Sequence, residues 1–291
     1  MPKLNAQATP FEALQWASLR FKQLEIDPED ARYLLMEQLG WNQTELLVHY
    51  REPLAADQVH KFQANVERRA AGEPVQYIMG RAPFYGLTLT VTPDVLIPRP
   101  ETEELVDWVL KDHGMRPLRV LDVGTGSGAI AIAIKQARPA WTVVASDISP
   151  AALQVARQNA QAQRTAIEFV ASDLLEAVPQ TPFDIVISNP PYIASSEVDV
   201  MDATVVNYEP KTALFADHQG LELYERLAAT VGPYLTTHAS VYLEIGYQQG
   251  PAVFAIWHQQ FPTAQLQVRK DLAGHERMVR MQKGEIDKDG N

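Results

Sequence analysis

The 291-residue sequence contains no cysteine. Disulfide bonds, thiolate zinc sites and cysteine nucleophiles are therefore excluded. The seven histidines are scattered along the chain without the spacing of a metal-ligand set. We therefore expect these histidines to be structural or solvated, and we expect no metal cofactor.

Long apolar runs are also absent. No stretch approaches the roughly 18 apolar residues that a membrane-spanning helix requires. Residues 1–5 (MPKLN) lack the apolar core of a secretory signal. Together with the lack of cysteine, these features favour a cytoplasmic protein with no membrane partner.

The sequence has no excess of basic charge, because 25 Lys and Arg stand against 36 Asp and Glu, a formal net charge of −11. Proteins that bind nucleic acid through its phosphates usually carry a basic face. A nucleic-acid partner is therefore disfavoured. The 46 % hydrophobic and 21 % charged residues are typical of a globular protein, and the length allows one large and one smaller domain.

The pattern of the first part of the chain predicts a small helical bundle. Apolar residues recur at helical spacing between residues 10 and 71, and no convincing strand interrupts them. Asp27 and Pro28 form a helix start, and Gly40 fits the stop of the same helix. We predict a helical domain over residues 1–73 that docks a partner, because it carries no catalytic constellation.

The pattern changes at residue 74. Gly80, Gly86 and the alternating Leu87, Leu89 and Val91 predict a β-hairpin within a linker over residues 74–98. In residues 99–291 strands alternate with helices, which predicts an α/β domain with a mostly parallel sheet covered by helices on both sides. The expected strands are 118–123, 141–146, 166–170, 184–188, 239–245 and 264–269. The expected helices are 101–112, 128–137, 149–162, 219–232 and 248–259, and residues 283–291 form a polar tail.

The most informative segment is Asn189-Pro190-Pro191-Tyr192, which follows the apolar run of residues 183–188. Two consecutive prolines cannot continue a sheet ladder, so the buried strand must end there. In open α/β sheets, ligands bind at the carboxyl ends of the strands. An amide, two carbonyls and an aromatic ring at that edge suit a planar substrate that carries an NH2 group.

A glycine-rich turn lies between an earlier strand and its helix: Gly124, Thr125, Gly126, Ser127 and Gly128. Glycines permit the sharp turn and let a ligand approach the backbone closely. The spacing is one residue short of the G-x-G-x-x-G that seats a pyrophosphate. Asp122 precedes the turn, where its carboxylate could orient a cationic or amino-bearing ligand.

Acidic residues end the next two strands. Asp147 could accept hydrogen bonds from both hydroxyls of a ribose, and Asp173 could accept from an adenine amino group while Leu174 packs beside the ring. Three successive strand ends with this chemistry, followed by the Asn189 segment, look like a class I S-adenosylmethionine-dependent methyltransferase.

The resemblance reaches beyond the fold. The Asn189 tetrad matches the motif of methyltransferases that act on exocyclic or amide nitrogens. Several other segments resemble the release factor glutamine methyltransferases, the PrmC/HemK family: residues 73–80 (EPVQYIMG), 96–103 (LIPRPETE), 208–210 (YEP) and 271–277. The match spans nearly the whole chain, and it implies a Rossmann-like, mostly parallel seven-stranded sheet behind a small helical domain.

By this resemblance, the enzyme methylates the side-chain amide nitrogen (N5) of the glutamine in the Gly-Gly-Gln motif of peptide chain release factors 1 and 2. S-adenosyl-L-methionine is the donor and S-adenosyl-L-homocysteine the product. The positions that correspond to the family's donor site are Gly124, Thr125, Gly126, Ser127, Gly128, Asp147, Asp173, Leu174 and Asn189. For Arg99, a structural salt bridge and a role in lining the site are equally open.

We expect the tetrad to position the substrate amide. The Asn189 side-chain oxygen and the Pro190 carbonyl each accept one N–H, and Tyr192 packs against the amide plane. Pro191 completes the expected substrate-binding set. Other functions compete with this hypothesis. A nucleic-acid methyltransferase acting on adenine N6 or guanine N2 is the first, a non-catalytic protein that retains the donor pocket is the second, and an NAD-dependent oxidoreductase is the least favoured.

Overall fold

The computed structural model describes residues 4–284, so most of the predicted polar tail lies outside the described residues. These residues form two compact units, which are described separately. One comprises residues up to 81 together with 202–208, and the other comprises 82–201 and the residues from 209 onward. The chain therefore passes between the units three times.

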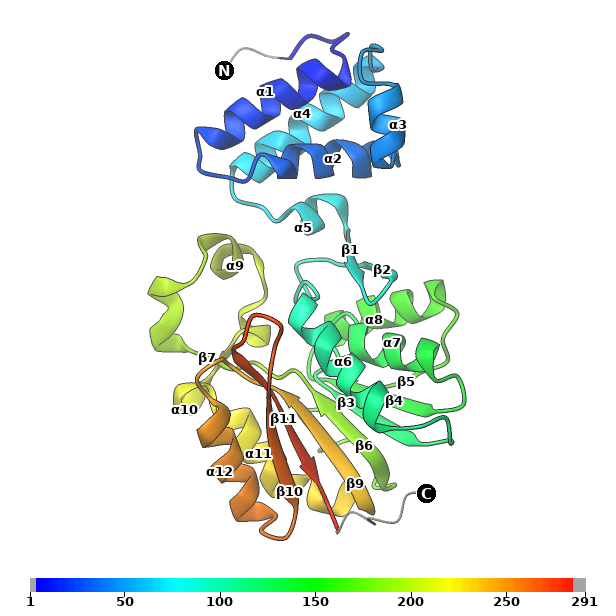
Figure 1. Cartoon of the computed structure of the whole chain (residues 1–291), viewed down its shortest axis with the longest axis vertical. Helices are drawn as coiled ribbons and strands as arrows, with labels where there is room; N and C mark the ends of the chain where they lie inside the picture. Colours follow the sequence, from blue (N-terminus) through cyan, green and yellow to red (C-terminus); the bar gives the residue numbers. More distant parts are fainter. Residues whose placement is uncertain (1–3, 285–291) are drawn as a thin grey trace. The chain divides into compact units, whose positions relative to one another are not determined.

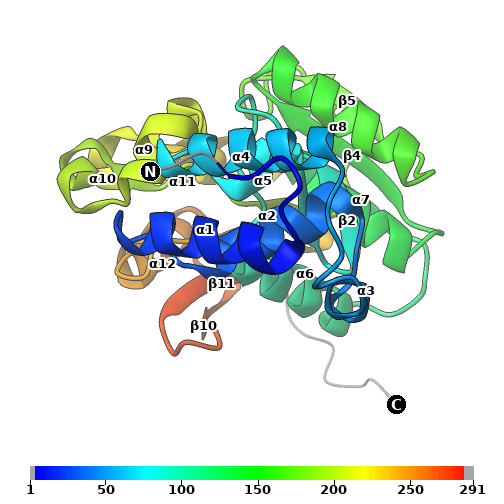
Figure 2. The same cartoon turned by 90° about the horizontal axis from the view of Figure 1, so that it is seen from above.

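The first unit is a helical bundle, as the sequence predicts (Figure 1). Its N-terminal helices are α1 (Pro10–Lys22), α2 (Glu29–Leu39), α3 (Gln43–Val48), α4 (Ala56–Ala70) and α5 (Val75–Met79). Helix α1 packs against α2 and α4 (Figure 2). The core between them is apolar and fully buried, with Phe21, Leu34 and Phe62 as its large members.

Local signals explain where these helices begin and end. Thr9 caps α1 by accepting from the Glu12 amide, and Glu12 reaches back to the Thr9 amide. The Asp27 side chain accepts from the Glu29 amide at the start of α2. Gly40 ends α2 in the left-handed conformation at φ 68°, which confirms the predicted stop.

Sequence reasoning did not anticipate that helix α9 (Ala203–Tyr208) would cluster with this N-terminal unit. The Tyr208 hydroxyl donates to the Ala71 carbonyl at 3.0 Å. A segment that follows the Asn189 tetrad closely along the chain thus belongs to the helical unit rather than to the sheet unit.

The second unit has at its centre a seven-stranded sheet of order β10-β11-β9-β6-β3-β4-β5. Strands β9, β6, β3, β4 and β5 are parallel to one another, whereas β11 is antiparallel to both of its neighbours. The bounds are β3 (Arg119–Val123), β4 (Thr142–Asp147), β5 (Glu168–Ala171), β6 (Phe183–Ser188), β9 (Leu235–Glu244), β10 (Gln265–Lys270) and β11 (Glu276–Gln282). The predicted mostly parallel sheet is confirmed.

Helices cover both faces of this sheet (Figure 1). Alternate residues of each central strand point to opposite faces, so Ile185 and Ile187 enter one core while Val186 enters the other. The first face is covered by α6 (Pro100–Asp112), α7 (Ala129–Ala137) and α8 (Pro150–Ala162). The second is covered by α11 (Glu222–Thr230) and α12 (Gly250–Gln260).

Smaller elements complete the unit. Strands β1 (Arg81–Phe84) and β2 (Leu87–Thr90) form the predicted hairpin. Short elements that the sequence did not predict occupy residues 193–220. They are β7 (Ile193–Ala194), η1 (Ser195–Val200), η2 (Lys211–Ala213), β8 (Phe215–Ala216) and α10 (Asp217–Gly220), and η3 (Gly232–Tyr234) follows α11.

Two predictions for this unit need correction. The six strands expected individually omit β11, whose sequence ERMVRMQ mixes charged and apolar residues and weakens the period-2 signal. The single helix expected over residues 219–232 is shorter than predicted: Gln219 and Gly220 adopt positive φ within α10, and the right-handed helix α11 begins only at Glu222. Left-handed residues cannot continue a right-handed helix.

Candidate active site

A cavity of about 350 Å³ opens at the carboxyl ends of the parallel strands, within the sheet unit. Loops after β3, β4, β5 and β6 all contribute to it, as expected for an open α/β sheet. Most of the site residues predicted from the sequence line this cavity, namely Gly124, Thr125, Gly126, Ser127, Asp147, Asp173, Leu174, Asn189, Pro190 and Pro191. Gly128 and Tyr192 do not line it.

The glycine turn is held by backbone hydrogen bonds. The Gly124 and Thr125 amides both donate to the Ser146 carbonyl of β4, at 2.8 and 2.9 Å. Gly128 has φ +83°, and a Cβ there would stand 3.0 Å from Ile132 Cδ1 and 3.2 Å from Ala156 Cβ. Gly128 therefore permits close packing of α7 against α8.

Asp122 lies beneath the turn and is completely buried, so it is not one of the cavity-lining residues. The expectation that its carboxylate meets a ligand directly is wrong. Its Oδ2 accepts from the Thr125 hydroxyl at 2.6 Å, which anchors the loop from below. Burial raises the pKa of Asp122 to about 7, against the opposing effect of the Thr125 hydrogen bond.

Asp147 ends β4 at the cavity wall. Its Oδ2 accepts from the Gly126 amide at 2.8 Å, and its Oδ1 accepts from the Ser149 amide at 2.9 Å. Burial raises the pKa of Asp147, while these backbone donors oppose the rise. Each carboxylate oxygen retains a second lone pair, so both can still accept from hydroxyl groups of a ligand.

Asp173 and Leu174 follow β5. One oxygen of Asp173 is occupied, because Arg226 of α11 donates to it from Nη2 at 2.8 Å. Arg226 also lines the cavity, although no sequence pattern pointed to it. Leu174 has a positive φ of 47°, a conformation that strains a non-glycine residue and is frequent at ligand sites.

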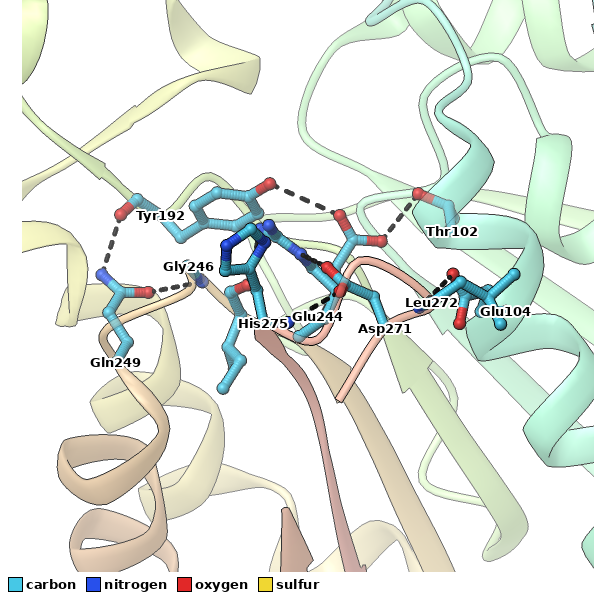
Figure 3. A network of polar contacts seen from close by, with 11 residues as sticks. Thr102, Glu104, Tyr192, Glu244, Gly246, Gln249, Asp271, Leu272 and His275 are labelled. Atoms are coloured by element: carbon cyan, nitrogen blue, oxygen red, sulfur yellow. Dashed lines mark hydrogen bonds and ion pairs between the residues drawn. The ribbon is translucent and has the colours of Figure 1, made fainter. Parts of the chain in front are cut away.

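The Asn189 tetrad emerges at the end of β6. The Asn189 side chain donates from Nδ2 to the Thr102 hydroxyl of α6 at 3.1 Å. Tyr192 turns its hydroxyl toward the buried Glu244 carboxylate of β9, with 3.4 Å between the oxygens (Figure 3). Burial is the main reason why the pKa of Tyr192 is raised, so its hydroxyl stays protonated.

The backbone of Tyr192 is held as well. Gln249 donates from Nε2 to the Tyr192 carbonyl at 2.9 Å and accepts from the Gly246 amide through Oε1 (Figure 3). Gly220 passes so close that a Cβ on it would lie 2.0 Å from the Tyr192 carbonyl oxygen. The tetrad is thus fixed at both its asparagine and its tyrosine ends.

Arg99 fulfils both roles that its sequence context left open. Arg99 lines the cavity, and its guanidinium pairs with Glu209, whose side chain is almost completely buried. The second oxygen of Glu209 accepts from the Ile97 amide at 3.1 Å. Glu209 therefore ties the residue 96–99 segment to the wall of the cavity.

Among the residues that sequence reasoning missed, Thr102 and Arg226 line the cavity, and Glu244 and Gln249 contact the Asn189 tetrad or hold it in place. A signal existed for Glu244, since it is a further acidic residue at the end of an expected strand, as Asp147 is. Thr102 lies in a segment that carries the family resemblance, but nothing in its own pattern shows that it meets Asn189.

Neither a metal cluster nor a membrane span is found among residues 4–284. No group of three or more His, Asp or Glu side chains in this part of the chain could hold a metal ion. No helix there is both long enough and apolar enough to cross a membrane.

Comparison with known proteins identifies the family. Residues 12–80 match the family described as "PrmC N-terminal domain", and residues 102–211 match "Methyltransferase small domain". A protein of Enterococcus faecalis named release factor glutamine methyltransferase is 42 % identical over 269 residues, covering 92 % of this chain and 97 % of the relative. The chain belongs to the release factor glutamine methyltransferase family.

A second member of this family, from Lactococcus lactis, is 44 % identical over 254 residues, which cover 87 % of this chain and 93 % of the relative. Among solved structures, a methyltransferase from Pyrococcus furiosus superimposes with a TM-score of 0.54 at 15 % identity, covering 76 % of this chain and 98 % of that one. That similarity shows the fold alone. The predicted class I methyltransferase fold with a helical N-terminal domain is confirmed.

Proposed function

We propose that the chain methylates the side-chain amide nitrogen, N5, of the glutamine in the Gly-Gly-Gln motif of peptide chain release factors. S-adenosyl-L-methionine is the donor and S-adenosyl-L-homocysteine the product. The observation that carries the proposal is that Asn189, Pro190 and Pro191 line the strand-end cavity, in a chain of this family.

The cavity residues fit the donor. Asp147 offers lone pairs for the ribose hydroxyls, the Gly124–Gly126 turn leaves its backbone accessible, and the strained Leu174 presents an apolar side chain to a flat ring. Asp173 offers the oxygen that Arg226 does not occupy. When bound, S-adenosylmethionine supplies a methyl group activated on a sulfonium.

Asn189 and Pro190 hold the substrate amide that receives the methyl group. An amide nitrogen is a poor nucleophile, because its lone pair is delocalised into the carbonyl. The Asn189 oxygen and the Pro190 carbonyl each accept one N–H of the substrate amide, which aims the lone pair and favours the positive charge that develops on nitrogen. Positioning of this kind can supply about 7–11 kcal/mol of the barrier reduction.

The helical domain, residues 1–73, docks the release factor, and residues 74–98 link it to the methyltransferase domain of residues 99–291. Supporting this role, the described part of the helical domain has large apolar side chains on its surface, including Phe11, Leu19, Leu47 and Val48. We propose release factors 1 and 2 as the substrates, and we propose that no nucleic acid or membrane takes part.

The test is incubation with methyl-labelled donor and purified release factor. Label should enter a release factor with native Gly-Gly-Gln but not one with Gly-Gly-Ala. Asn189→Ala should abolish transfer, whereas Gln158→Ala, on the exposed surface of α8, should not affect it. Equal labelling of both release factors would refute the glutamine assignment. Label entering added nucleic acid instead would favour the nucleic-acid methyltransferase.

A further inference from the structure

Glu244 is a buried carboxylate that the mechanism above does not use. It ends β9 with 1 % of its surface exposed. Its Oε2 accepts from the Thr102 hydroxyl at 2.6 Å, and its Oε1 faces the Tyr192 hydroxyl. Figure 3 shows the Glu244 carboxylate reaching toward both side chains. A buried carboxylate is costly, so its partners in the site require an explanation.

The direction of the hydrogen bonds follows from the number of protons. Thr102 has a single hydroxyl proton, and the Glu244 carboxylate accepts it. Thr102 can then only accept from Asn189, so the atom that faces it must be the amide nitrogen. The Asn189 oxygen is consequently the end of the amide left to accept from a ligand.

We propose that Thr102 and Glu244 are positioning residues for methyl transfer: they fix the orientation of the Asn189 amide so that its oxygen, and not its NH2 group, faces the substrate nitrogen. This inference rests on the proposed function. The three side chains, here called the Asn189–Thr102–Glu244 relay, come from the loop after β6, from α6 and from β9.

The relay depends on the ionisation of Glu244. Burial, the largest influence, raises the pKa of Glu244 to about 7, and the Thr102 hydrogen bond opposes the rise. The other charged and titratable groups around it are Arg277 of β11 with its partner Asp271, Glu101 of α6, Tyr192, and Tyr224, whose hydroxyl donates to the Glu244 backbone carbonyl.

Protonation of Glu244 reverses the direction of the hydrogen bonds in the relay. A protonated Glu244 donates to Thr102, and the Thr102 proton is then free to point at Asn189. The amide turns to accept that proton through its oxygen, and its NH2 group meets the substrate NH2 group, donor against donor. Transfer therefore requires the ionised form, which increases as the pH rises through 7.

The experiment measures kcat for release factor methylation at saturating donor between pH 6 and pH 8. The ionised fraction of a group with pKa about 7 increases about tenfold over that range, so kcat of the parent should rise about tenfold. Glu244→Gln cannot ionise, so kcat of this variant should change by less than about twofold between pH 6 and pH 8. Asp122 titrates in the same range in both proteins, so the difference between their profiles reports Glu244.

Variants of Thr102 form the second part of the experiment. Thr102→Val keeps the shape of the side chain but removes the hydroxyl. We expect kcat to fall about 100-fold, because the Asn189 amide is then misplaced. KM for the release factor and the affinity for the donor should stay within about threefold of the parent's values. Thr102→Ser, which keeps the hydroxyl, should restore kcat. Thr236→Val, at the opposite end of β9, is the matched control, because its hydroxyl lies near Asp184 and outside the cavity.

A Glu244→Gln profile that rises like the parent's, or a Thr102→Val kcat near the parent's, would overturn the relay. If Glu244→Gln does not fold, the Thr102 pair decides alone. A parent enzyme that labels no release factor would overturn the proposed function, and the relay with it.

Discussion

The close approach of Gly220 to the tetrad gives a sharp mutational prediction. Gly220 has φ +80° and follows two further left-handed residues, His218 and Gln219. A Cβ at this position would lie 2.0 Å from the Tyr192 carbonyl oxygen and 2.7 Å from Gln249 Nε2. Gly220→Ala should therefore displace the tyrosine end of the tetrad.

The size of the effect of Gly220→Ala on stability and kcat follows from these distances. Since a carbon and a carbonyl oxygen rest no closer than about 3.3 Å, the two segments must separate by about 1.3 Å. The left-handed backbone costs alanine about 1–2 kcal/mol, and loss of the bond from Gln249 to Tyr192 costs about 1 kcal/mol. We expect the free energy of unfolding to fall by about 2–3 kcal/mol, and kcat to fall about 100-fold because a displacement near 1 Å misaligns the tetrad.

The assays are urea unfolding followed by fluorescence and single-turnover methyl transfer at saturating donor. Gly232→Ala is the matched control, because a Cβ there meets nothing within 4 Å and its φ is not positive. Gly220→Ala with the stability and kcat of Gly232→Ala would refute the argument, since the left-handed backbone and the clash are what set Gly220 apart.

Three further predictions concern the donor, the acceptor and the fold. Asp147→Ala should weaken donor binding about 10- to 100-fold by calorimetry, because charge-assisted hydrogen bonds are lost; unchanged affinity would contradict its role. Asn189→Ala should reduce transfer by at least about 100-fold with donor affinity nearly intact, and a parallel loss of donor affinity would argue against a substrate-positioning role. Burial lowers the pKa of His113 from 6.5 to about 4, so the unfolded chain takes up the proton first as the pH falls below 6.5. The free energy of unfolding should therefore drop by about 2–3 kcal/mol between pH 6.5 and pH 4 beyond the drop seen in His113→Phe. His60→Gln, at an exposed position, should behave like the parent, and equal slopes for all three proteins would disprove the His113 contribution.

Local rules were sufficient for much of the fold. Thr9 and Gly40 carry capping signals that act within one helical turn, and the central strands are apolar enough to be recognised without their neighbours. Strand β11 could not be recognised in this way, because its charged residues interrupt the alternation of apolar and polar positions. Helix α9 was missed because what holds it is its packing against distant parts of the helical unit, such as the Tyr208 contact with Ala71.

The strand-end cavity shows the same division. The glycine turn, Asp147 and Asn189 could be placed at one edge from the sequence, because parallel strands bring their carboxyl ends together. The sequence could not show how deeply each of these side chains is buried. Asp122 and Asp147 both sit at strand ends, yet Asp122 is hidden beneath Thr125 while Asp147 faces the cavity.

The sequence alone predicted an α/β domain and a buried strand that ends at the Asn189 tetrad, since proline, glycine and the period of apolar residues act locally. The methyltransferase hypothesis came from the resemblance of this and other segments to a known family. Only the tertiary structure decided how that tetrad is oriented. Thr102 lies 87 residues from Asn189 and 142 from Glu244, and no local rule relates positions so far apart. Packing of α6 against the end of β9 brings the three together, and the single proton of Thr102 then determines which end of the Asn189 amide is left to accept.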